Sequence, residues 1–269
     1  MRIDDQSLLP ATSVHSLEAK RVGRTRDLAT QADEINRALK DLPLAERLKY
    51  VRREIDGRIV LTTGFGMESQ VILHHIAEHD INIEIATLDT GRLFPETYKL
   101  WEDTERRYNR RIRAIFPRPD AVADLVDEHG INGFYKSKDA RLSCCNVRKV
   151  EPLKRALSGA KAWVAGLRGS QSVYRAGIGL ATANAEHKLI KVNPLFDWSR
   201  EEVLAFAQRN DVPISPLHEQ GFASIGCAPC TRAILPGEDE RAGRWWWEKD
   251  NQKECGLHWV GGVPQHVAG

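Results

Sequence analysis

The sequence predicts an α/β fold, a single domain built on a twisted, parallel-type sheet with helices on both faces. Short apolar segments rich in β-branched residues alternate with helical segments between residues 58 and 210. Such alternation is typical of parallel strands joined by helical crossovers. The 269 residues are 42% hydrophobic and 28% charged, and no internal repeat interrupts the pattern. That length and composition suit one globular domain with a sizeable core.

Apolar periodicity and terminal signals define the expected elements. Pro95 suits the first turn of a helix, Gly130 suits a helix end, and Ser199 with Glu202 has capping-box spacing. Helices 29–42 and 44–55 are expected to precede the sheet. The expected strands are 58–63, 81–90, 111–117, 161–168 and 188–195. The expected intervening and following helices are 69–79, 95–108, 120–130 and 199–210.

Three regions are expected along the chain. Residues 1–25 show no sustained period and are expected to form a flexible arm, 26–235 the α/β domain, and 236–269 a mobile C-terminal segment. No segment has the apolar core of a signal peptide or the roughly 20 apolar residues of a membrane helix. The net charge of +2 is too small to indicate nucleic-acid binding. We therefore expect a cytoplasmic protein without a nucleic-acid or membrane partner.

A glycine turn follows the first expected strand. In "LTTGFGMESQ", Gly64 and Gly66 would let the backbone approach a ligand, and the following helix would present free N–H groups to an anion. "LDTGRLFPET" supplies a second strand-end turn, whose Asp89 would face the same cleft or cap the next helix. The motif lacks the Gly-Lys-Ser/Thr of a Walker A loop. A tight turn without ligand is the alternative.

Four of the five cysteines form two pairs, Cys144–Cys145 and Cys227–Cys230. Adjacent Cα atoms lie about 3.8 Å apart, which is too close for an unstrained disulfide. Zinc sites use C-x2-4-C pairs, and only the second pair fits that spacing. Adjacent cysteines can instead reach different irons, so the pattern favours a [4Fe-4S] cluster over zinc or buried apolar thiols. The neighbouring basic residues would balance thiolate charge or bind a substrate anion, namely Arg141, Arg148 and Lys149.

The fifth cysteine, Cys255, lies near the end of the sequence between Lys253 and His258. These neighbours could lower its pKa, and the thiolate is the reactive form. An idle surface thiol is the alternative. The preceding "DERAGRWWWEKD" combines two arginines, suited to sulfate or phosphate oxygens, with three tryptophans whose expected role is packing.

Together these motifs resemble the assimilatory adenylylsulfate reductases, relatives of the phosphoadenylylsulfate reductases in the PP-loop adenine nucleotide α-hydrolase superfamily. The resemblance covers about residues 45 to 260, and its most specific part is the paired cysteines with "ECGLH". It implies a [4Fe-4S] cluster and adenosine 5′-phosphosulfate as substrate. The implied cluster ligands are Cys144, Cys145, Cys227 and Cys230.

The resemblance also implies a mechanism in sulfate assimilation and cysteine biosynthesis. The Cys255 thiolate attacks the substrate's sulfur, AMP leaves, and thioredoxin or glutaredoxin releases sulfite from the cysteine S-sulfonate. His258 is implied beside Cys255. The implied substrate-binding residues are Gly64, Phe65, Gly66, Glu68, Ser69, Asp89, Lys149, Arg168, Arg175, Arg241 and Arg244. A homo-oligomer is compatible with the sequence.

Two other enzymes stay open. A phosphoadenylylsulfate reductase is disfavoured by the complete cysteine quartet. An iron–sulfur PP-loop enzyme that thiolates RNA is disfavoured by the weak net charge and by the absence of a Ser-Gly-Gly-x-Asp-Ser loop. A non-catalytic zinc protein is a third reading, and it would be colourless.

Overall fold

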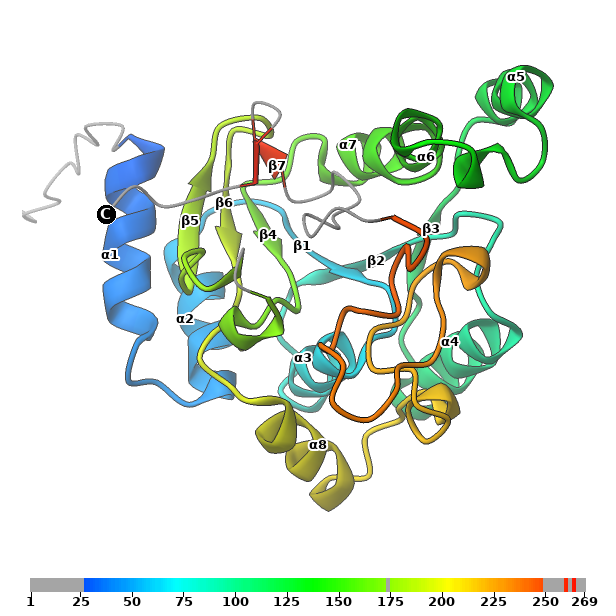
Figure 1. The fold of residues 1–269 in the computed structure, drawn as a ribbon. Coiled ribbons are helices and arrows are strands. Elements are labelled where there is room, and N and C mark those ends of the chain that lie inside the picture. Colours follow the sequence, from blue (N-terminus) through cyan, green and yellow to red (C-terminus); the bar gives the residue numbers. More distant parts are fainter. Residues whose placement is uncertain (1–26, 173–174, 249–258, 261–262, 265–269) are drawn as a thin grey trace, which may run out of the picture.

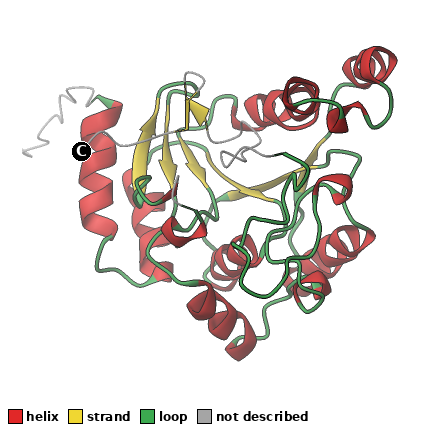
Figure 2. Ribbon diagram, in the orientation of Figure 1, coloured by secondary structure: helices red, strands yellow, loops and turns green. Residues whose placement is uncertain are grey.

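The computed structural model describes residues 27–172, 175–248, 259–260 and 263–264. A six-stranded sheet lies at its centre (Figures 1 and 2). The α-helices are α1 Leu28–Leu39, α2 Leu44–Glu54, α3 Met67–Glu78, α4 Pro95–Tyr108, α5 Pro119–His129, α6 Lys138–Cys145, α7 Glu151–Leu157 and α8 Arg200–Arg209. The sheet strands are β1 Ile59–Thr63, β2 Glu84–Leu88, β3 Arg113–Ile115, β4 Ala162–Val164, β5 Ala181–Asn184 and β6 Leu189–Val192. The short helical turns are Gly133–Tyr135, Asn146–Val150, Gly169–Gln171, Pro216–His218 and Ala228–Cys230.

The strand order is β3-β2-β1-β4-β6-β5, and the first five strands in this order are parallel. The register pairs Leu61 with Ile85 on one side of β1 and with Val164 on the other. The chain runs outward from β1 to β3 and then returns to the opposite side of β1. This reversal leaves a crevice at the carboxyl ends of β1 and β4, where ligands bind in open α/β sheets.

Alternate residues of the central strands belong to two separate cores, because successive side chains point to opposite faces of a sheet. Ile59 and Leu61 of β1 join the core formed with α1, α2, α3 and α8. Val60 between them joins the second core, which includes Leu153 and Leu157 of α7. Figure 2 shows helices on both sides of the sheet. The expected fold class is therefore confirmed.

Three elements differ from expectation. β5 was not expected, and it pairs antiparallel with β6 at the sheet edge. Helices α6 and α7 were also not expected, although α7 covers the second face of the sheet. Their sequence, "KDARLSCCNVRKVEPLKRAL", contains a proline at the start of α7 and buried basic residues, which break the usual apolar stripe.

The segment after α8 folds against the body of the protein without long regular elements. It carries the turns Pro216–His218 and Ala228–Cys230, and Thr231 pairs with Arg244 in an isolated antiparallel bridge. In Figure 1 this segment, coloured from yellow to orange, lies in front of α3 and α4. Residues 236–248 therefore pack on the domain rather than standing apart from it. A short hairpin of β7 Trp259–Val260 and β8 Val263–Pro264 follows.

Two expected regions fall largely outside the described residues. The N-terminal arm, 1–25, is wholly outside, as is the part of the C-terminal segment that holds Cys255 and His258. None of the described helices is both long and apolar enough to cross a membrane.

Candidate active site

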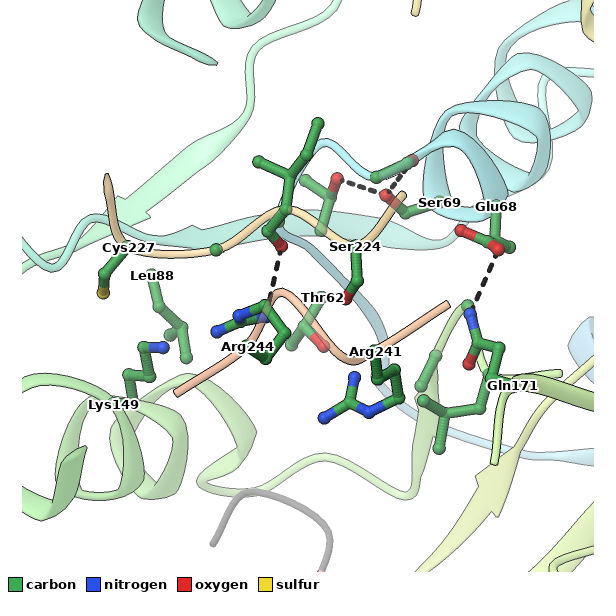
Figure 3. A pocket seen from close by; sticks show the side chains of 18 of the residues that line it. Thr62, Glu68, Ser69, Leu88, Lys149, Gln171, Ser224, Cys227, Arg241 and Arg244 are labelled. Atoms are coloured by element: carbon green, nitrogen blue, oxygen red, sulfur yellow. Dashed lines mark hydrogen bonds between the residues drawn. The ribbon is translucent and has the colours of Figure 1, made fainter. Parts of the chain in front are cut away.

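A cavity of ≈ 240 Å³ lies in the crevice at the strand ends. Its walls include Thr62 and Thr63 at the end of β1, Leu88 at the end of β2, and Gly166 just after β4. Its other side is built by residues 223–227, which follow α8, and by Glu240, Arg241, Arg244 and Trp245 of the C-terminal segment. The sheet reversal thus places the cavity, and the late segment of the chain encloses it (Figure 3).

The glycine turn forms one edge of the cavity through Gly64, Gly66, Glu68 and Ser69. The hydroxyl groups of Thr63 and Ser69 form hydrogen bonds within the turn itself. Ser69 Oγ donates to the Gly66 carbonyl at 2.8 Å and lies 2.9 Å from Thr63 Oγ1, which accepts from the Phe65 N–H at 2.9 Å. Gly66 is the N-cap of α3 and makes no side-chain cap. The turn therefore offers a ligand the backbone N–H groups at the start of α3 rather than its serine hydroxyl.

Phe65 was expected to contact substrate, but its side chain points into the core. It is 2% exposed, stacks on Trp101 with ring centroids 5.7 Å apart, and does not line the cavity. Its φ of +60° is the left-handed conformation that the turn requires. The residue therefore anchors the turn from beneath.

Glu68 faces the cavity and is held by two donors. Arg168 Nε lies 2.8 Å and Gln171 Nε2 3.0 Å from Glu68 Oε1. Arg168 is 1% exposed, also binds both carboxylate oxygens of Glu240 at 2.7 Å, and does not line the cavity. The structure thus places Arg168 behind the wall, pairing two cavity carboxylates, whereas an anion-binding position was expected.

Asp89 was expected to line the cleft or to cap the next helix, and the structure shows neither, because its carboxylate closes the turn after β2 and the N-cap of α4 is Phe94 without a side-chain cap. Its Oδ1 accepts from the Gly91 N–H at 2.9 Å and from the Tyr98 hydroxyl at 2.8 Å. Burial and this bond to Asp89 raise the pKa of Tyr98 to about 12. Asp89 does not line the cavity, and its neighbour Thr90 does.

Basic side chains also line the cavity. Lys149, Arg241 and Arg244 all line it, and Figure 3 shows Lys149 beside Cys227 with the two arginines toward the middle. Arg244 stacks on Trp245 at 4.6 Å, and a Cβ on Gly226 would lie 2.3 Å from Arg244 Nη2. Glycine at 226 therefore leaves room for this guanidinium. Arg175 lines the cavity farther along and hydrogen-bonds Gln171.

The four paired cysteines, far apart in sequence, surround one small second cavity. Its lining also includes basic and aromatic side chains, Phe134, Arg141, Arg148 and Lys149. None of the four forms a disulfide. Within the described part of the chain, no three His, Cys, Asp or Glu side chains lie close enough to hold a single metal ion.

A π-helical turn, Asn146–Val150, joins α6 to α7 directly after Cys145. Such turns insert an extra residue into a helix and are frequent at functional sites. Both basic residues of this turn are buried, with Arg148 donating to the Thr90 carbonyl at 2.8 Å. Lys149 lines both the large cavity and the cysteine cavity. The turn therefore places its basic side chains at the wall between the large cavity and the cysteine cavity.

The cysteines differ in electrostatic environment. Burial raises the pKa of Cys230 to about 11 and also raises the pKa of Cys144. Burial acts in the same direction on Cys227, but Lys149, a hydrogen bond from Thr90 and Arg244 together lower its pKa below the ordinary value. Cys227 also lines both cavities.

Trp245 packs between the two cavities, where sequence analysis expected only general packing. It is 1% exposed, and the guanidinium carbons of Arg141 and Arg244 lie 4.8 Å and 4.6 Å from its ring centroid. Its indole N–H and that of Trp247 are buried and have no hydrogen-bond partner among the described residues. Both tryptophans pack on the cysteine group.

Comparison with known proteins identifies relatives of this chain. The model of the phosphoadenosine phosphosulfate reductase domain matches residues 58–233, which is more than half of the chain. This chain belongs to the phosphoadenosine phosphosulfate reductase family. Proteins named adenosine 5′-phosphosulfate reductase from Sinorhizobium fredii (strain USDA 257) and Allochromatium vinosum are 50% and 55% identical to it. The first alignment covers 87% of this chain and 93% of the relative, and the second covers 79% and 83%.

A solved member of the phosphoadenosine phosphosulfate reductase family has the same fold. The phosphoadenylyl-sulfate reductase of Candida auris, crystallised as a phosphate complex, superposes with a TM-score of 0.66 at 26% identity. The superposition covers 76% of this chain and 97% of that one.

Several cavity residues of this family member were not expected from the sequence. Thr62, Trp163, Gln171 and Ser224 line the cavity, and no role was predicted for any of them. Thr62 carried a signal, because it belongs to the segment "LTTGFGMESQ" and lies near the end of the strand that leads into the glycine turn.

Proposed function

We propose that the chain is a thioredoxin-dependent adenylyl-sulfate reductase, which reduces adenosine 5′-phosphosulfate to sulfite and AMP in sulfate assimilation. The observation that carries this proposal is the wall between the two cavities. Lys149 and Cys227 each line a nucleotide-sized cavity and a four-cysteine cavity. The proteins 50% and 55% identical over most of the chain are named for this reduction.

The cavity suits a nucleotide whose anion lies beside the basic side chains. Lys149, Arg241 and Arg244 can neutralise a phosphosulfate group, and arginine binds such oxygens bidentately. The apolar part of the lining, with Leu88, Leu153 and Leu167, suits the nucleoside. The first-turn N–H groups of α3 provide further donors at the glycine turn.

The proposed reaction has two steps. In the first, the Cys255 thiolate attacks the sulfur of the sulfate group, the S–O bond to the phosphate breaks, and AMP leaves with the electron pair of that bond. His258 is proposed to lie beside Cys255. Lys149, Arg241 and Arg244 would stabilise the charge that develops on the leaving phosphate.

In the second step, one thiolate of reduced thioredoxin attacks Cys255 Sγ of the S-sulfonate, and sulfite leaves with the electron pair of the S–S bond. The second thioredoxin thiol then resolves the mixed disulfide and regenerates the Cys255 thiolate. The two electrons come from the dithiol, which leaves as a disulfide. We place Cys255 in a functionally distinct C-terminal segment, 236–269, that completes the site.

The cysteine cavity fits a [4Fe-4S] cluster. Four cysteine side chains surround it and none of them is in a disulfide, cations adjoin it, and two buried indole N–H groups beside it have no partner among the described residues and could donate to sulfur. Cys144, Cys145, Cys227 and Cys230 would hold the cluster. When bound, the cluster would place a fixed charge next to Lys149. Arg148, which donates to the Thr90 carbonyl, and Lys149, which lines the substrate cavity, would then lie between the cluster and the substrate anion.

The test is turnover of each purified nucleotide with thioredoxin, with sulfite and AMP measured separately. We expect adenosine 5′-phosphosulfate to be reduced far faster than its 3′-phosphorylated form. Preference for the 3′-phosphorylated form would instead support a phosphoadenylylsulfate reductase, the activity named for the Candida auris structure. Anaerobic purification followed by iron and sulfide quantification tests the cofactor, with about four of each per chain expected.

A further inference from the structure

The hydroxyl group of Thr62 differs from the other hydroxyls of the β1 turn in having no acceptor for its proton. Trp163 Nε1 lies 2.7 Å from Thr62 Oγ1. An indole N–H is only a donor, so Thr62 Oγ1 must accept in this bond. No acceptor for the Thr62 proton is found in the described parts of the chain. Thr62 lines the cavity, so its proton is left to donate there.

The neighbouring hydroxyls are already committed. Ser69 Oγ donates to the Gly66 carbonyl, so Thr63 Oγ1 donates to Ser69 Oγ at 2.9 Å while accepting from the Phe65 N–H. The Thr90 hydroxyl accepts from the Arg92 N–H at 3.2 Å and lies 3.3 Å from the Cys227 sulfur. Ser224 lines the cavity on a loop, and no hydrogen bond orients its hydroxyl within the described structure. Thr62 alone among these hydroxyls is both oriented and uncommitted.

The bond from Trp163 is rigidly supported. Trp163 is 1% exposed, belongs to the second core, and has the Lys191 ammonium 4.6 Å from its ring centroid. β1 and β4 are adjacent and parallel, with Val60 opposite Trp163. The register therefore fixes the indole N–H beside Thr62. Because the Trp163 N–H donates to one lone pair of Thr62 Oγ1, the Thr62 O–H favours orientations that point away from the indole.

The cavity position of Thr62 identifies its ligand chemistry. Figure 3 shows Thr62 between Arg241 and Arg244, and the residue lies just before the glycine turn that leads into α3. All of these groups present donors, and an anion is what a set of converging donors binds. Resting on the proposed function, we infer that Thr62 donates its hydroxyl proton to a phosphate oxygen of the bound nucleotide. Trp163 is the positioning residue that holds the hydroxyl in its donating orientation.

The test compares two ligands that differ only in the phosphate, AMP and adenosine, by calorimetric titration of the purified, cluster-loaded protein. Thr62→Val keeps the shape of the side chain and removes the hydroxyl. We expect it to weaken AMP binding about tenfold while adenosine binding stays within about twofold. Thr62→Ser retains the hydroxyl and is expected to retain the wild-type ratio of the two affinities.

Trp163→Phe tests the positioning role. It keeps an aromatic ring and removes the N–H, so the Thr62 hydroxyl is no longer oriented. We expect the AMP-to-adenosine ratio to fall, and Thr62→Val to change that ratio less in the Trp163→Phe background than in the wild type. Any loss of core packing should affect both ligands alike and so leave their ratio unchanged.

Two results would overturn the inference. Thr62→Val could weaken adenosine and AMP by the same factor, which would indicate a structural role, or it could weaken neither. The proposed function has its own readout in the same preparation, sulfite release from adenosine 5′-phosphosulfate by the wild-type protein. Absence of that release with normal AMP binding would reject the function and leave the role of Thr62 to be judged on the binding ratio.

Discussion

Lys149 and Cys227 lie together on the wall that separates the large cavity from the cysteine cavity, and each lines both. Lys149 acts on the Cys227 thiol through its charge and a hydrogen bond, and it offsets the effect of burial on the pKa of that thiol. One cation therefore faces a sulfur ligand on one side and the space for a substrate anion on the other.

Lys149→Met should separate these two tasks. Removing the cation leaves the four thiols in place but removes charge stabilisation from the leaving phosphate, so we expect kcat/KM to fall on the order of 100-fold. Iron content should stay near the wild-type value. The measurement is steady-state kinetics together with iron quantification. Lys99→Met, on the exposed face of α4, is the matched control and should leave both values unchanged.

The cysteines should divide into two classes. Cys255→Ser is expected to abolish sulfite formation and to leave the brown colour of the cluster, since the nucleophile is lost and the four ligands remain. Cys145→Ala is expected to lose both colour and activity, because three thiolates leave one iron without its protein ligand. Absorbance spectra and sulfite assays distinguish the two outcomes. A Cys255→Ser protein with normal turnover would contradict the proposed mechanism.

The ion pair between Arg141 and Glu248 should contribute strongly to stability. Arg141 is fully buried, the Glu248 side chain is 7% exposed, and two hydrogen bonds of 2.8 Å join them. Glu248→Gln leaves the buried guanidinium without its counter-charge, and we expect it to lower the free energy of unfolding by about 3 kcal/mol. Urea denaturation measures this loss.

The matched control for that substitution is Glu102→Gln. Glu102 forms an exposed pair with Lys99, with 68% and 60% of the side chains accessible. Exposed pairs contribute little because solvent screens them, so a change below about 1 kcal/mol is expected. Equal losses in the two variants would show that burial of the Arg141 pair is not what matters.

Acid should destabilise the packing of α3 against α8 through His75. Burial lowers the pKa of this imidazole from 6.5 to about 4, with both ring nitrogens lacking a partner in the described structure. The unfolded chain therefore binds the proton more tightly than the folded one. The stability contribution is fully present above pH 6.5 and falls as the pH decreases toward 4.

His75→Phe should flatten this dependence, because phenylalanine keeps the ring contact with Phe206 and does not titrate. The measurement is the urea midpoint at a series of pH values between 4 and 7. Some slope should persist, since burial also lowers the pKa of His74, His187 and His218. An unchanged slope in His75→Phe would assign the acid sensitivity to those residues.

Much of the architecture follows from local sequence. The strands expected at 58–63 and 81–90 appear as β1 and β2, because strands of a parallel sheet that are buried on both faces have continuous apolar sequences. Pro95 at the start of α4 and the Ser199–Glu202 capping box of α8 are local signals that the structure confirms. The expected convergence of the two cysteine pairs is also seen.

Tertiary structure decided which side chains face the cavity. Phe65, Asp89 and Arg168 share the motifs that line it, yet they are turned toward the core, the local turn and two carboxylates. The antiparallel β5 and the π-helical turn that contains Lys149 also have no local signature. Spacing along the chain fixes which backbone segments meet, but the direction of a side chain depends on partners distant in sequence, such as Trp163 for Thr62. Those partners are set by strand register and packing, which a single sequence pattern does not encode.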